Sequence, residues 1–289
     1  MNSDKTRVLI LGASGMLGNT LLRFYCRSEG FQAIGSVRDT KAFGLLPTDL
    51  HPQVRVGFDL ENGDRLAELL ASTRPDVVIN CAGIVKQLAA SDEVMACVPI
   101  NTLLPHRLSS LCALAGARLV HMSTDCVFSG SKGLYTETDT PDASDLYGRS
   151  KQMGEVTAPH ALTLRTSIIG HELAGARSLI NWFLSQPGPV KGYRRAIFSG
   201  LPTVEIARVI RDHVLPAPHL SGLYHLSADP ISKFDLLTLV AAQYGKRIEI
   251  QPDDIVAIDR SLDSTRFRKE TQFEPRPWPE MIQAMHEFG

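Results

Sequence analysis

A tyrosine and a lysine stand four residues apart in the segment Tyr147-Gly-Arg-Ser-Lys151. If the segment is helical, the two side chains share one face. A lysine ammonium beside a phenol stabilises the phenolate and so lowers the pKa of the tyrosine. Tyr147 is therefore a candidate general acid near neutral pH, and Lys151 a candidate for tuning it and for holding a ribose. Taken alone, a pair at this spacing is also common on exposed helix surfaces.

Hydroxyl groups follow a short apolar run in the segment Ser-Thr-Asp at positions 123–125. In open α/β sheets, ligands bind at the carboxyl ends of the strands. A hydroxyl there can polarise a carbonyl group that Tyr147 protonates, although a helix cap or a turn explains the same residues. Asn101 can hold a water that relays protons to Lys151, with a helix N-cap as the alternative.

Three glycines are spaced as GxxGxxG over residues 12–18, between a short apolar run and a segment of helical periodicity. Glycine permits a tight turn and lets backbone N–H groups approach a phosphate. The helix that follows presents the positive end of its dipole to the anion. The loop predicts a nucleotide site, although a strand-to-helix turn without a ligand has the same sequence. The residues expected to contact the cofactor are Gly12, Ser14, Gly15, Met16 and Leu17.

The residues after the second predicted strand indicate which dinucleotide binds. An acidic residue there holds the ribose hydroxyl of NAD, whereas an arginine accommodates the phosphate of NADP. Ser36 and Arg38 therefore favour NADP, with NAD as the alternative and a merely solvated Arg38 as another interpretation. Asp59, followed by Leu60, can reach an adenine amino group or can cap a helix. The small residues expected beside the cofactor after the fourth strand are Cys81, Ala82 and Gly83.

The first half of the chain alternates between apolar runs and segments of helical period. Runs rich in Val, Ile and Leu suit strands that are buried on both faces of a parallel sheet. The predicted strands are Val8–Leu11, Ala33–Val37, Val54–Phe58, Val77–Cys81, Arg118–Met122 and Leu162–Arg165, and the helical segments are Leu17–Arg27, Arg65–Ser72 and Thr102–Ala115. This alternation predicts an α/β fold with a Rossmann-type, doubly wound parallel sheet.

The second half is interrupted by prolines and has weaker strand signals. We therefore predict an NADP-binding Rossmann domain over residues 1–166, which later segments can join. Residues 167–289 are expected to form mainly a smaller, mixed α/β lobe that binds substrate. Within it, Thr203 is expected to cap a helix that runs through His213, and Ser232 to cap another that ends near Gly245.

The composition excludes several classes of protein. The 289 residues include 30 Lys and Arg against 31 Asp and Glu, so no excess of positive charge is present to neutralise nucleic-acid phosphates. No apolar stretch reaches the ~20 residues of a bilayer span, and the first apolar run is too short for a signal peptide. We expect a cytoplasmic protein that contacts neither nucleic acid nor membrane. The cysteines form no CxxC pair, so no metal site is expected, and Cys26, Cys97 and Cys112 are expected to be buried thiols.

Seven motifs follow one another along the chain. They are the glycine loop, Pro75-Asp-Val-Val-Ile-Asn80, Ser123-Thr-Asp-Cys-Val-Phe-Ser-Gly130, Tyr135-Thr-Glu-Thr-Asp-Thr-Pro141, the pentad Tyr147–Lys151, Leu164-Arg-Thr-Ser167 and Gly200-Leu-Pro-Thr203. In this order and spacing they resemble the extended short-chain dehydrogenase/reductases and, within that family, the dTDP-4-dehydrorhamnose reductases. The resemblance runs from about residue 7 to residue 215 and is looser beyond.

The resemblance implies NADPH-dependent reduction of a nucleotide-activated keto-deoxysugar in carbohydrate biosynthesis. It also implies that Thr124, Tyr147 and Lys151 are the catalytic trio. Thr124, rather than the serine before it, stands at the family's position for the hydroxyl. Related dehydratases carry an Asp-Glu pair after this threonine, whereas here Asp125 is followed by Cys126, which disfavours dehydration.

The substrate is expected over the carboxyl ends of the strands, between the two lobes. Trp182 can cover a base or sugar face or belong to the core, Arg194 can meet a diphosphate or be solvated, and Thr203 can touch substrate or serve only as a cap. Lys86 lies in the segment Ile84-Val-Lys-Gln87, where this sequence departs from the reductases and where the family's residues face the sugar. Alternatively, it is a solvated loop charge. The residues expected to bind substrate are Lys86, Thr124, Asp125, Tyr147, Trp182, Arg194 and Thr203.

Two other functions fit the same motifs. One is epimerisation or reduction of a UDP- or GDP-sugar. The other is a non-catalytic, NADP-binding regulatory subunit, as in a methionine adenosyltransferase partner, and the intact trio counts against it. The motifs leave a homodimer open.

Overall fold

The computed structural model describes residues 5–87 and 89–289. Its contacts divide the chain into two compact units, each made of several segments. Unit 1 comprises residues 1–123, 145–164 and 219–223, and unit 2 comprises residues 124–144, 165–218 and 224–289. The predicted domain boundary at residue 166 stays a prediction. The two units are each made of three segments that alternate along the chain.

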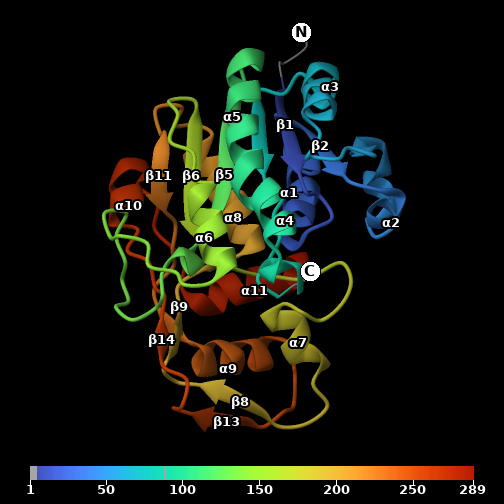
Figure 1. Ribbon diagram of the computed structural model, residues 1–289. Coiled ribbons are helices and arrows are strands. Elements are labelled where there is room, and N and C mark those ends of the chain that lie inside the picture. Colours follow the sequence, from blue (N-terminus) through green and yellow to red (C-terminus); the bar gives the residue numbers. More distant parts are fainter. Residues whose placement is uncertain (1–4, 88) are drawn as a thin grey trace. The chain divides into compact units, whose positions relative to one another are not determined.

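A seven-stranded sheet forms the centre of unit 1, with the strand order β11-β6-β5-β4-β1-β2-β3 (Figure 1). Neighbouring strands from β5 to β3 pair in parallel. The bounds are β1 Thr6–Leu11, β2 Phe31–Val37, β3 Val54–Val56, β4 Val77–Asn80, β5 Arg118–Thr124, β6 Ala161–Thr166 and β11 Gly222–His225. The predicted α/β, Rossmann-type sheet is therefore confirmed.

Helices cover the sheet because their apolar faces pack on strands that are themselves buried. Every residue of β4 is buried. Leu66 and Leu69 of α3 join Leu104 and Leu108 of α5 in one core cluster with residues of β1, β4 and β5. The helical elements of this unit are α1 Met16–Cys26, α2 Thr40–Phe43, η1 Thr48–Gln53, α3 Gly63–Thr73, η2 Ala89–Asp92, α4 Val94–Cys97, η3 Val98–Leu103, α5 Leu104–Ala115 and α6 Leu146–Met153.

Three expectations for these elements need correction. The third strand ends at Val56 rather than at Phe58, because Gly57 adopts a left-handed conformation with φ of 85°. The helix expected from residue 102 is preceded by helical turns that begin at Val94. Cys26 is exposed at the end of α1, whereas Cys97 and Cys112 are buried as expected.

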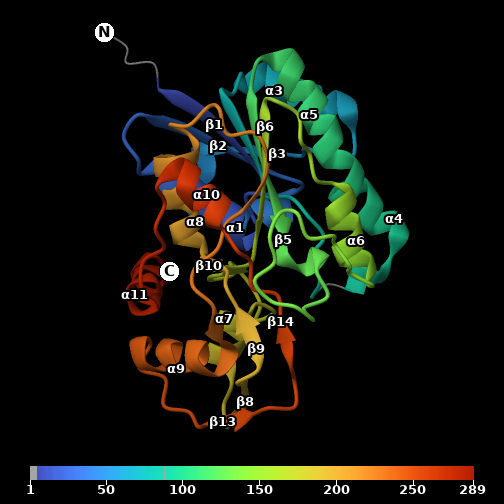
Figure 2. The ribbon, with the colours of Figure 1, turned by 90° about the vertical axis from the view of Figure 1, so that its left-hand side faces the viewer.

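Unit 2 is a mixture of short strands and helices, as predicted for the C-terminal part of the chain. Its small sheets have the orders β10-β7, β12-β9-β14 and β13-β8, and Figure 2 shows β9 beside β14 and β8 near β13. The strands are β7 Ile168–Ile169, β8 Val190–Tyr193, β9 Ala196–Phe198, β10 Leu201–Pro202, β12 Ile231–Ser232, β13 Ile250–Asp253 and β14 Ile258–Asp259. The helical elements are η4 Asp125–Val127, α7 Leu179–Ser185, α8 Thr203–Val209, η5 Ile210–Val214, α9 Lys233–Gln243, α10 Thr265–Thr271 and α11 Trp278–Phe288.

The two predicted helix caps in this unit have different outcomes. Ser232 caps α9 as expected, since its hydroxyl accepts a hydrogen bond from the backbone N–H of Asp235 at 3.0 Å. Thr203 does not cap α8, because the N-cap residue is Pro202 and Thr203 is the first residue inside the helix. The helical turns nevertheless continue through Val214, close to the predicted end at His213.

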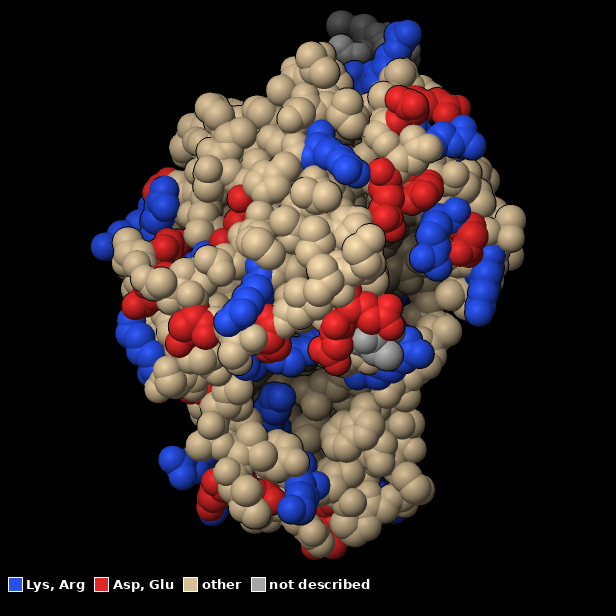
Figure 3. All heavy atoms as spheres, in the orientation of Figure 1, with Lys and Arg blue, Asp and Glu red and all other residues tan. Residues whose placement is uncertain are grey.

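Charged side chains of both signs are interspersed over the face seen in Figure 3. This agrees with the nearly balanced composition. Within the described residues, no helix combines the length and the hydropathy that a bilayer span requires.

Candidate active site

The glycine loop between β1 and α1 is packed so closely that it leaves no room for a side chain at Gly12 or at Gly18. Gly12 has a φ of 77°, and a Cβ there would lie 3.0 Å from the backbone of Ala82. A Cβ on Gly18 would overlap the carbonyl oxygen of Gly12. Gly15 is the N-cap residue of α1, and no side chain caps this end of the helix. The first N–H groups of α1, from Met16 and Leu17, therefore stand at an end that suits an anion, and the loop fits a dinucleotide phosphate.

Ser36 and Arg38 lie at the end of β2, beside this loop. Ser36 is buried, and its backbone carbonyl accepts a hydrogen bond from the N–H of Ala13 at 3.0 Å. The Arg38 side chain is 82% exposed, and its Nε donates to Asp39 Oδ2 at 3.2 Å. An exposed ion pair of this kind contributes little to stability. The guanidinium of Arg38 is thus accessible to a ligand phosphate.

Asp59 follows β3 and caps a turn rather than a helix. Its Oδ1 accepts a hydrogen bond from the N–H of Glu61 at 3.0 Å. The cap of α3 is instead Asn62, whose side chain accepts from two N–H groups of the helix. Asp59 is exposed, and Leu60 packs against the core cluster of unit 1. The helix-cap alternative for Asp59 is therefore wrong, and its adenine contact stays a prediction.

Two buried asparagines shape the loop after β4. Asn80 Oδ1 accepts from the N–H of Ala82 at 3.1 Å, and its amide nitrogen lies 3.1 Å from Nδ1 of His121. Asn101 Oδ1 accepts from the N–H of Ile84 at 2.9 Å, and its Nδ2 donates to Ser150 Oγ at 3.2 Å. These bonds hold the segment with Cys81 and Gly83 in place.

The N-cap alternative for Asn101 is wrong, because the residue lies inside η3 and makes its hydrogen bonds to other elements. Its side chain joins the loop after β4 to α6, the helix of Tyr147. The proton relay to Lys151 stays a prediction.

Helix α6 carries Tyr147 and Lys151 and begins at a charged cap. Asp145 Oδ1 accepts a hydrogen bond from the N–H of Gly148 at 2.8 Å, and Lys86 Nζ lies 2.7 Å from the other carboxylate oxygen. Lys86 is exposed, and its ion pair links the loop after β4 to the first turn of α6, while its contact with substrate stays a prediction. Tyr147, one turn before Lys151, is half-buried.

Lys151 is buried, with only 6% of its surface exposed. Its Nζ donates a hydrogen bond to the carbonyl oxygen of Met122 on β5 at 2.7 Å. Burial lowers the pKa of Lys151 to about 8, while the negative charge of Glu155 acts in the opposite direction. Lys151 is thus mainly protonated at neutral pH and loses its proton at a slightly higher pH.

The two adjacent hydroxyls at the end of β5 have different partners. Ser123 Oγ donates to Glu155 Oε1 at 2.7 Å. Thr124 Oγ1 accepts from the N–H of Cys126 at 3.1 Å and lies 3.3 Å from Asp125 Oδ1. Burial raises the pKa of Asp125. Thr124 therefore caps the short turn η4, as the cap alternative expects. The hydrogen bonds of Thr124 given above do not include Glu155, the partner of Ser123.

Unit 2 carries the other predicted substrate residues on three separate elements. Trp182 of α7 is 37% exposed, so it is not a core aromatic. Arg194, between β8 and β9, forms a two-point ion pair with Asp254 and is exposed. Thr203 is buried at the start of α8. Their approach to substrate stays a prediction.

A sequence profile of the RmlD substrate binding domain family matches residues 6–287. The chain belongs to this family. A dTDP-4-dehydrorhamnose reductase of Aggregatibacter actinomycetemcomitans is 30% identical over 314 aligned positions, which cover 98% of this chain and 99% of the relative. Methionine adenosyltransferase 2 subunit beta of Danio rerio is 26% identical and covers 83% of this chain and 74% of the relative. For some other curated relatives, the chain spans about half of their length.

A crystal structure of the dTDP-4-dehydrorhamnose reductase of Bacillus anthracis in complex with NADP shares the fold, with a TM-score of 0.79. It is 20% identical, and the match covers 100% of both chains. The match includes the residues of both units, so each unit has a counterpart in the fold of the Bacillus anthracis structure.

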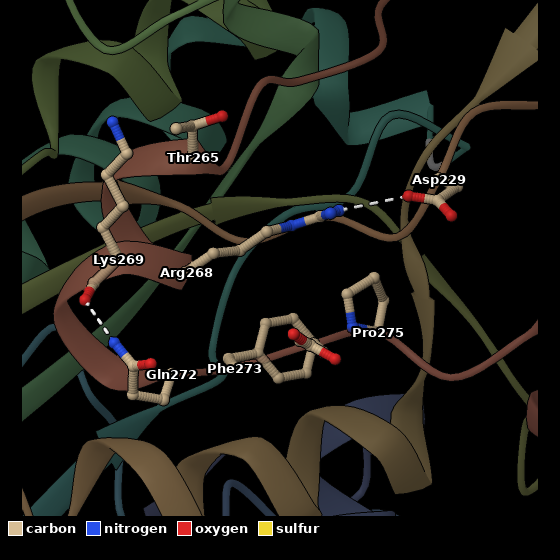
Figure 4. Close-up of a pocket in the computed structure, with 8 residues that line it drawn as sticks. Asp229, Thr265, Arg268, Lys269, Gln272, Phe273 and Pro275 are labelled. Carbon is tan, nitrogen blue, oxygen red and sulfur yellow. Dashed lines mark hydrogen bonds and ion pairs between the residues drawn. The ribbon is translucent and has the colours of Figure 1, made fainter.

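One pocket of this RmlD-family chain lies in unit 2 around α10, away from the predicted site residues in sequence. Figure 4 shows Arg268 directed across it toward Asp229, at 3.4 Å. Arg268 also donates to the hydroxyl of Ser264 and the carbonyl of Ser227. The guanidinium of Arg268 is therefore already bound to groups of the protein itself. The lining residues are Asp229, Thr265, Arg268, Lys269, Gln272, Phe273, Glu274 and Pro275.

Three groups at the site were not singled out as functional by sequence reasoning. The carbonyl of Met122 and the cap residue Asp145 make contacts that cannot be deduced from their residue types alone. The four-residue spacing between Lys151 and Glu155 could have drawn attention to Glu155, although the helix ends at Met153, before Glu155. Within the described residues, no cluster of His, Cys, Asp and Glu has the arrangement of a metal site.

Proposed function

We propose that this chain is an NADPH-dependent reductase of a nucleotide-activated keto-deoxysugar, of the dTDP-4-dehydrorhamnose type. The observation that carries the proposal is the pair on α6. Tyr147 stands one turn before a buried Lys151 whose Nζ is anchored on the carbonyl of Met122. The relative named dTDP-4-dehydrorhamnose reductase, matched over nearly all of both chains, supports this choice of substrate class.

The glycine loop and the end of β2 support NADP as the cofactor, with NAD as the alternative. The tight backbone around Gly12 and Gly18 leaves the N-terminus of α1 open to a diphosphate. Arg38 offers an exposed guanidinium suited to a ribose phosphate. The remaining contacts are assigned to Ser14, Ser36, Asp59, Leu60, Cys81, Ala82, Gly83 and Asn101.

NADPH would supply a hydride to the carbonyl carbon of the sugar, which is thereby reduced to an alcohol. Tyr147 gives its phenolic proton to the carbonyl oxygen as the C–H bond forms and the C=O double bond is lost. Lys151, a buried cation, stabilises the phenolate that this transfer leaves behind. Thr124 orients the carbonyl group through its hydroxyl. Bulk solvent then returns a proton to Tyr147, with Asn101 as a candidate holder of the relaying water.

The sugar nucleotide is assigned to Lys86, Asp125, Trp182, Arg194 and Thr203 in addition to Thr124 and Tyr147. Arg194 would exchange its exposed partner Asp254 for a diphosphate. The partial exposure of Trp182 supports a stacking role on a base or a sugar.

Transfer of deuterium from deuterated NADPH tests the reaction directly. A reductase places one deuterium on the former carbonyl carbon for each NADPH oxidised. An epimerase recycles its cofactor and consumes no NADPH, so a changed sugar without NADPH consumption would favour the UDP- or GDP-sugar alternative. A regulatory subunit would bind NADPH, form a stoichiometric complex with a partner enzyme, and reduce no sugar.

Replacing Arg38 by Ala is expected to weaken NADPH binding by at least tenfold and NADH binding by less than threefold. The change removes a charge-assisted contact to the ribose phosphate, which NADH lacks, and such contacts contribute about 1.5–3 kcal/mol. Titration calorimetry with both cofactors measures the difference. Arg211→Ala, which removes an arginine paired with Asp212 in unit 2, is the matched control. Equal losses for the two cofactors would show that Arg38 does not contact the phosphate.

The predicted location in the cytoplasm and the homodimer stay predictions. Fractionation of the source cells and sedimentation analysis of the purified chain test them separately.

A further inference from the structure

Lys151 and Glu155 are both held to consecutive residues at the end of β5. The carbonyl of Met122 accepts from Lys151 Nζ at 2.7 Å, and the hydroxyl of Ser123 donates to Glu155 Oε1 at 2.7 Å. Met122 and Ser123 are each only 7% exposed. The strand end therefore fixes the lysine and the carboxylate together.

The turn after α6 brings Glu155 to this place. The helix ends at Met153, and the N–H of Glu155 donates to the carbonyl of Gln152 at 3.1 Å. Gly154 lies between them against η3, where a Cβ would overlap the carbonyl oxygen of Asn101. Only glycine fits this close contact, so the end of α6 can pack against η3 immediately before Glu155.

Three titratable groups near Lys151, namely Glu155, Cys81 and His121, bear on its charge. Burial raises the pKa of Cys81 to about 12, so its thiol is neutral and supplies no negative charge. Burial also lowers the pKa of His121 well below its usual value, so its ring is neutral and adds no positive charge. The carboxylate of Glu155 is the leading influence that raises the pKa of Lys151 against desolvation.

We propose that Glu155, oriented by the hydroxyl of Ser123, is a positioning residue that keeps Lys151 protonated beside Tyr147. The inference rests on the proposed reductase function, since it assigns a purpose to the cation. It also gives the two adjacent hydroxyl groups, those of Ser123 and Thr124, different roles. Ser123 holds the carboxylate, while Thr124 is left for the carbonyl group of the substrate.

The direct test is a titration of the Lys151 side chain by nitrogen-15 NMR, with its signal assigned by comparison with Lys151→Arg. The wild-type midpoint is expected near the pKa of about 8. In Glu155→Gln the ammonium loses a nearby negative charge, so the pKa of Lys151 should fall by about one pH unit. Ser123→Ala should lower it by less, because the carboxylate stays but is no longer oriented. Glu68→Gln, which removes an exposed carboxylate paired with Arg65 on α3, is the matched control and should leave the midpoint unchanged.

Glu155→Asp separates charge from shape. It retains the carboxylate and should keep the midpoint closer to that of the wild type than the isosteric Glu155→Gln does. A structural role would give the opposite order, with the shorter side chain the more damaging. Circular dichroism and thermal melting confirm that each variant is folded.

The pH profile of NADPH-dependent reduction provides a second readout. Activity requires protonated Lys151 and should be lost as pH rises through its pKa, so the alkaline limb of Glu155→Gln should move to lower pH with the NMR midpoint. An unchanged Lys151 midpoint in folded Glu155→Gln overturns the proposal. If instead the wild type reduces no sugar nucleotide, the reductase proposal fails, and the NMR titration still decides the role of Glu155.

Discussion

Replacing Tyr147 by Phe is expected to lower kcat by about 10²–10⁴-fold, because the change removes the proton donor and nothing else. The ring remains on α6, so the position of Lys151 and its bond to the carbonyl of Met122 should persist. NADPH affinity should stay within about threefold of the wild type, a free-energy change below the ~1.4 kcal/mol that a tenfold loss corresponds to. Steady-state kinetics and cofactor titration on the same preparation measure the two quantities.

Tyr244→Phe is the control for Tyr147→Phe. It also removes a phenolic hydroxyl, one that lies 2.8 Å from Nε2 of His171 in unit 2. Its kcat should equal that of the wild type. Turnover of Tyr147→Phe within fivefold of the wild type would remove Tyr147 from the mechanism.

Replacing Gly18 by Ala is expected to damage both stability and cofactor binding. The new Cβ would overlap the carbonyl oxygen of Gly12, and a backbone atom cannot rotate away as a side chain can. Overpacking of this kind costs about 1–3 kcal/mol, and α1 must shift away from the loop to relieve it. Urea denaturation should report that loss, and NADPH affinity should fall because the N–H groups of the loop move with the helix.

Gly63→Ala is the matched control for Gly18→Ala. Gly63 begins α3 with no atom within 4 Å of its would-be Cβ, and its φ is not positive. The change should leave stability equal to or up to about 1 kcal/mol above the wild type. Equal effects of the two substitutions would contradict the close packing of the glycine loop.

The sheet could be predicted because its strands are buried on both faces and therefore carry unbroken apolar runs. Val77–Asn80 is such a run, and every residue of it is buried. The edge strand β11 was missed because its sequence, Gly-Leu-Tyr-His, has no such run. The order of the strands depends on tertiary packing, which local sequence does not carry.

Helix ends show the limits of rules based on residue type. Ser232 obeys the capping preference, and Asp235 supplies the N–H that its hydroxyl binds. Thr203 has the same type of side chain, yet Pro202 takes the cap position and Thr203 is buried. The side-chain amide of Asn101 forms hydrogen bonds with Ile84 and Ser150. These partners lie close to it only in the folded chain, so the sequence does not reveal them.

For the candidate site, the sequence could suggest which residues to consider but not the environment in which they lie. The four-residue spacing suggested Tyr147 and Lys151 as candidates, because residues four apart on a helix lie on one face, and both do lie on α6. The burial of Lys151, its carbonyl partner Met122 and its pKa of about 8 follow from how α6 packs on β5. Likewise, the pairing of Lys86 with Asp145 joins residues 59 positions apart, a separation that no local pattern reveals.

The central claim is that this chain reduces the keto group of a nucleotide-linked deoxysugar with NADPH. Its most direct test is NADPH oxidation by the purified chain against dTDP-, UDP- and GDP-linked 4-keto-6-deoxysugars, followed by the loss of NADPH absorbance. We expect consumption of one NADPH for each sugar reduced, fastest with the dTDP-linked substrate. A chain that binds NADPH but consumes none with any of these sugars would contradict the account.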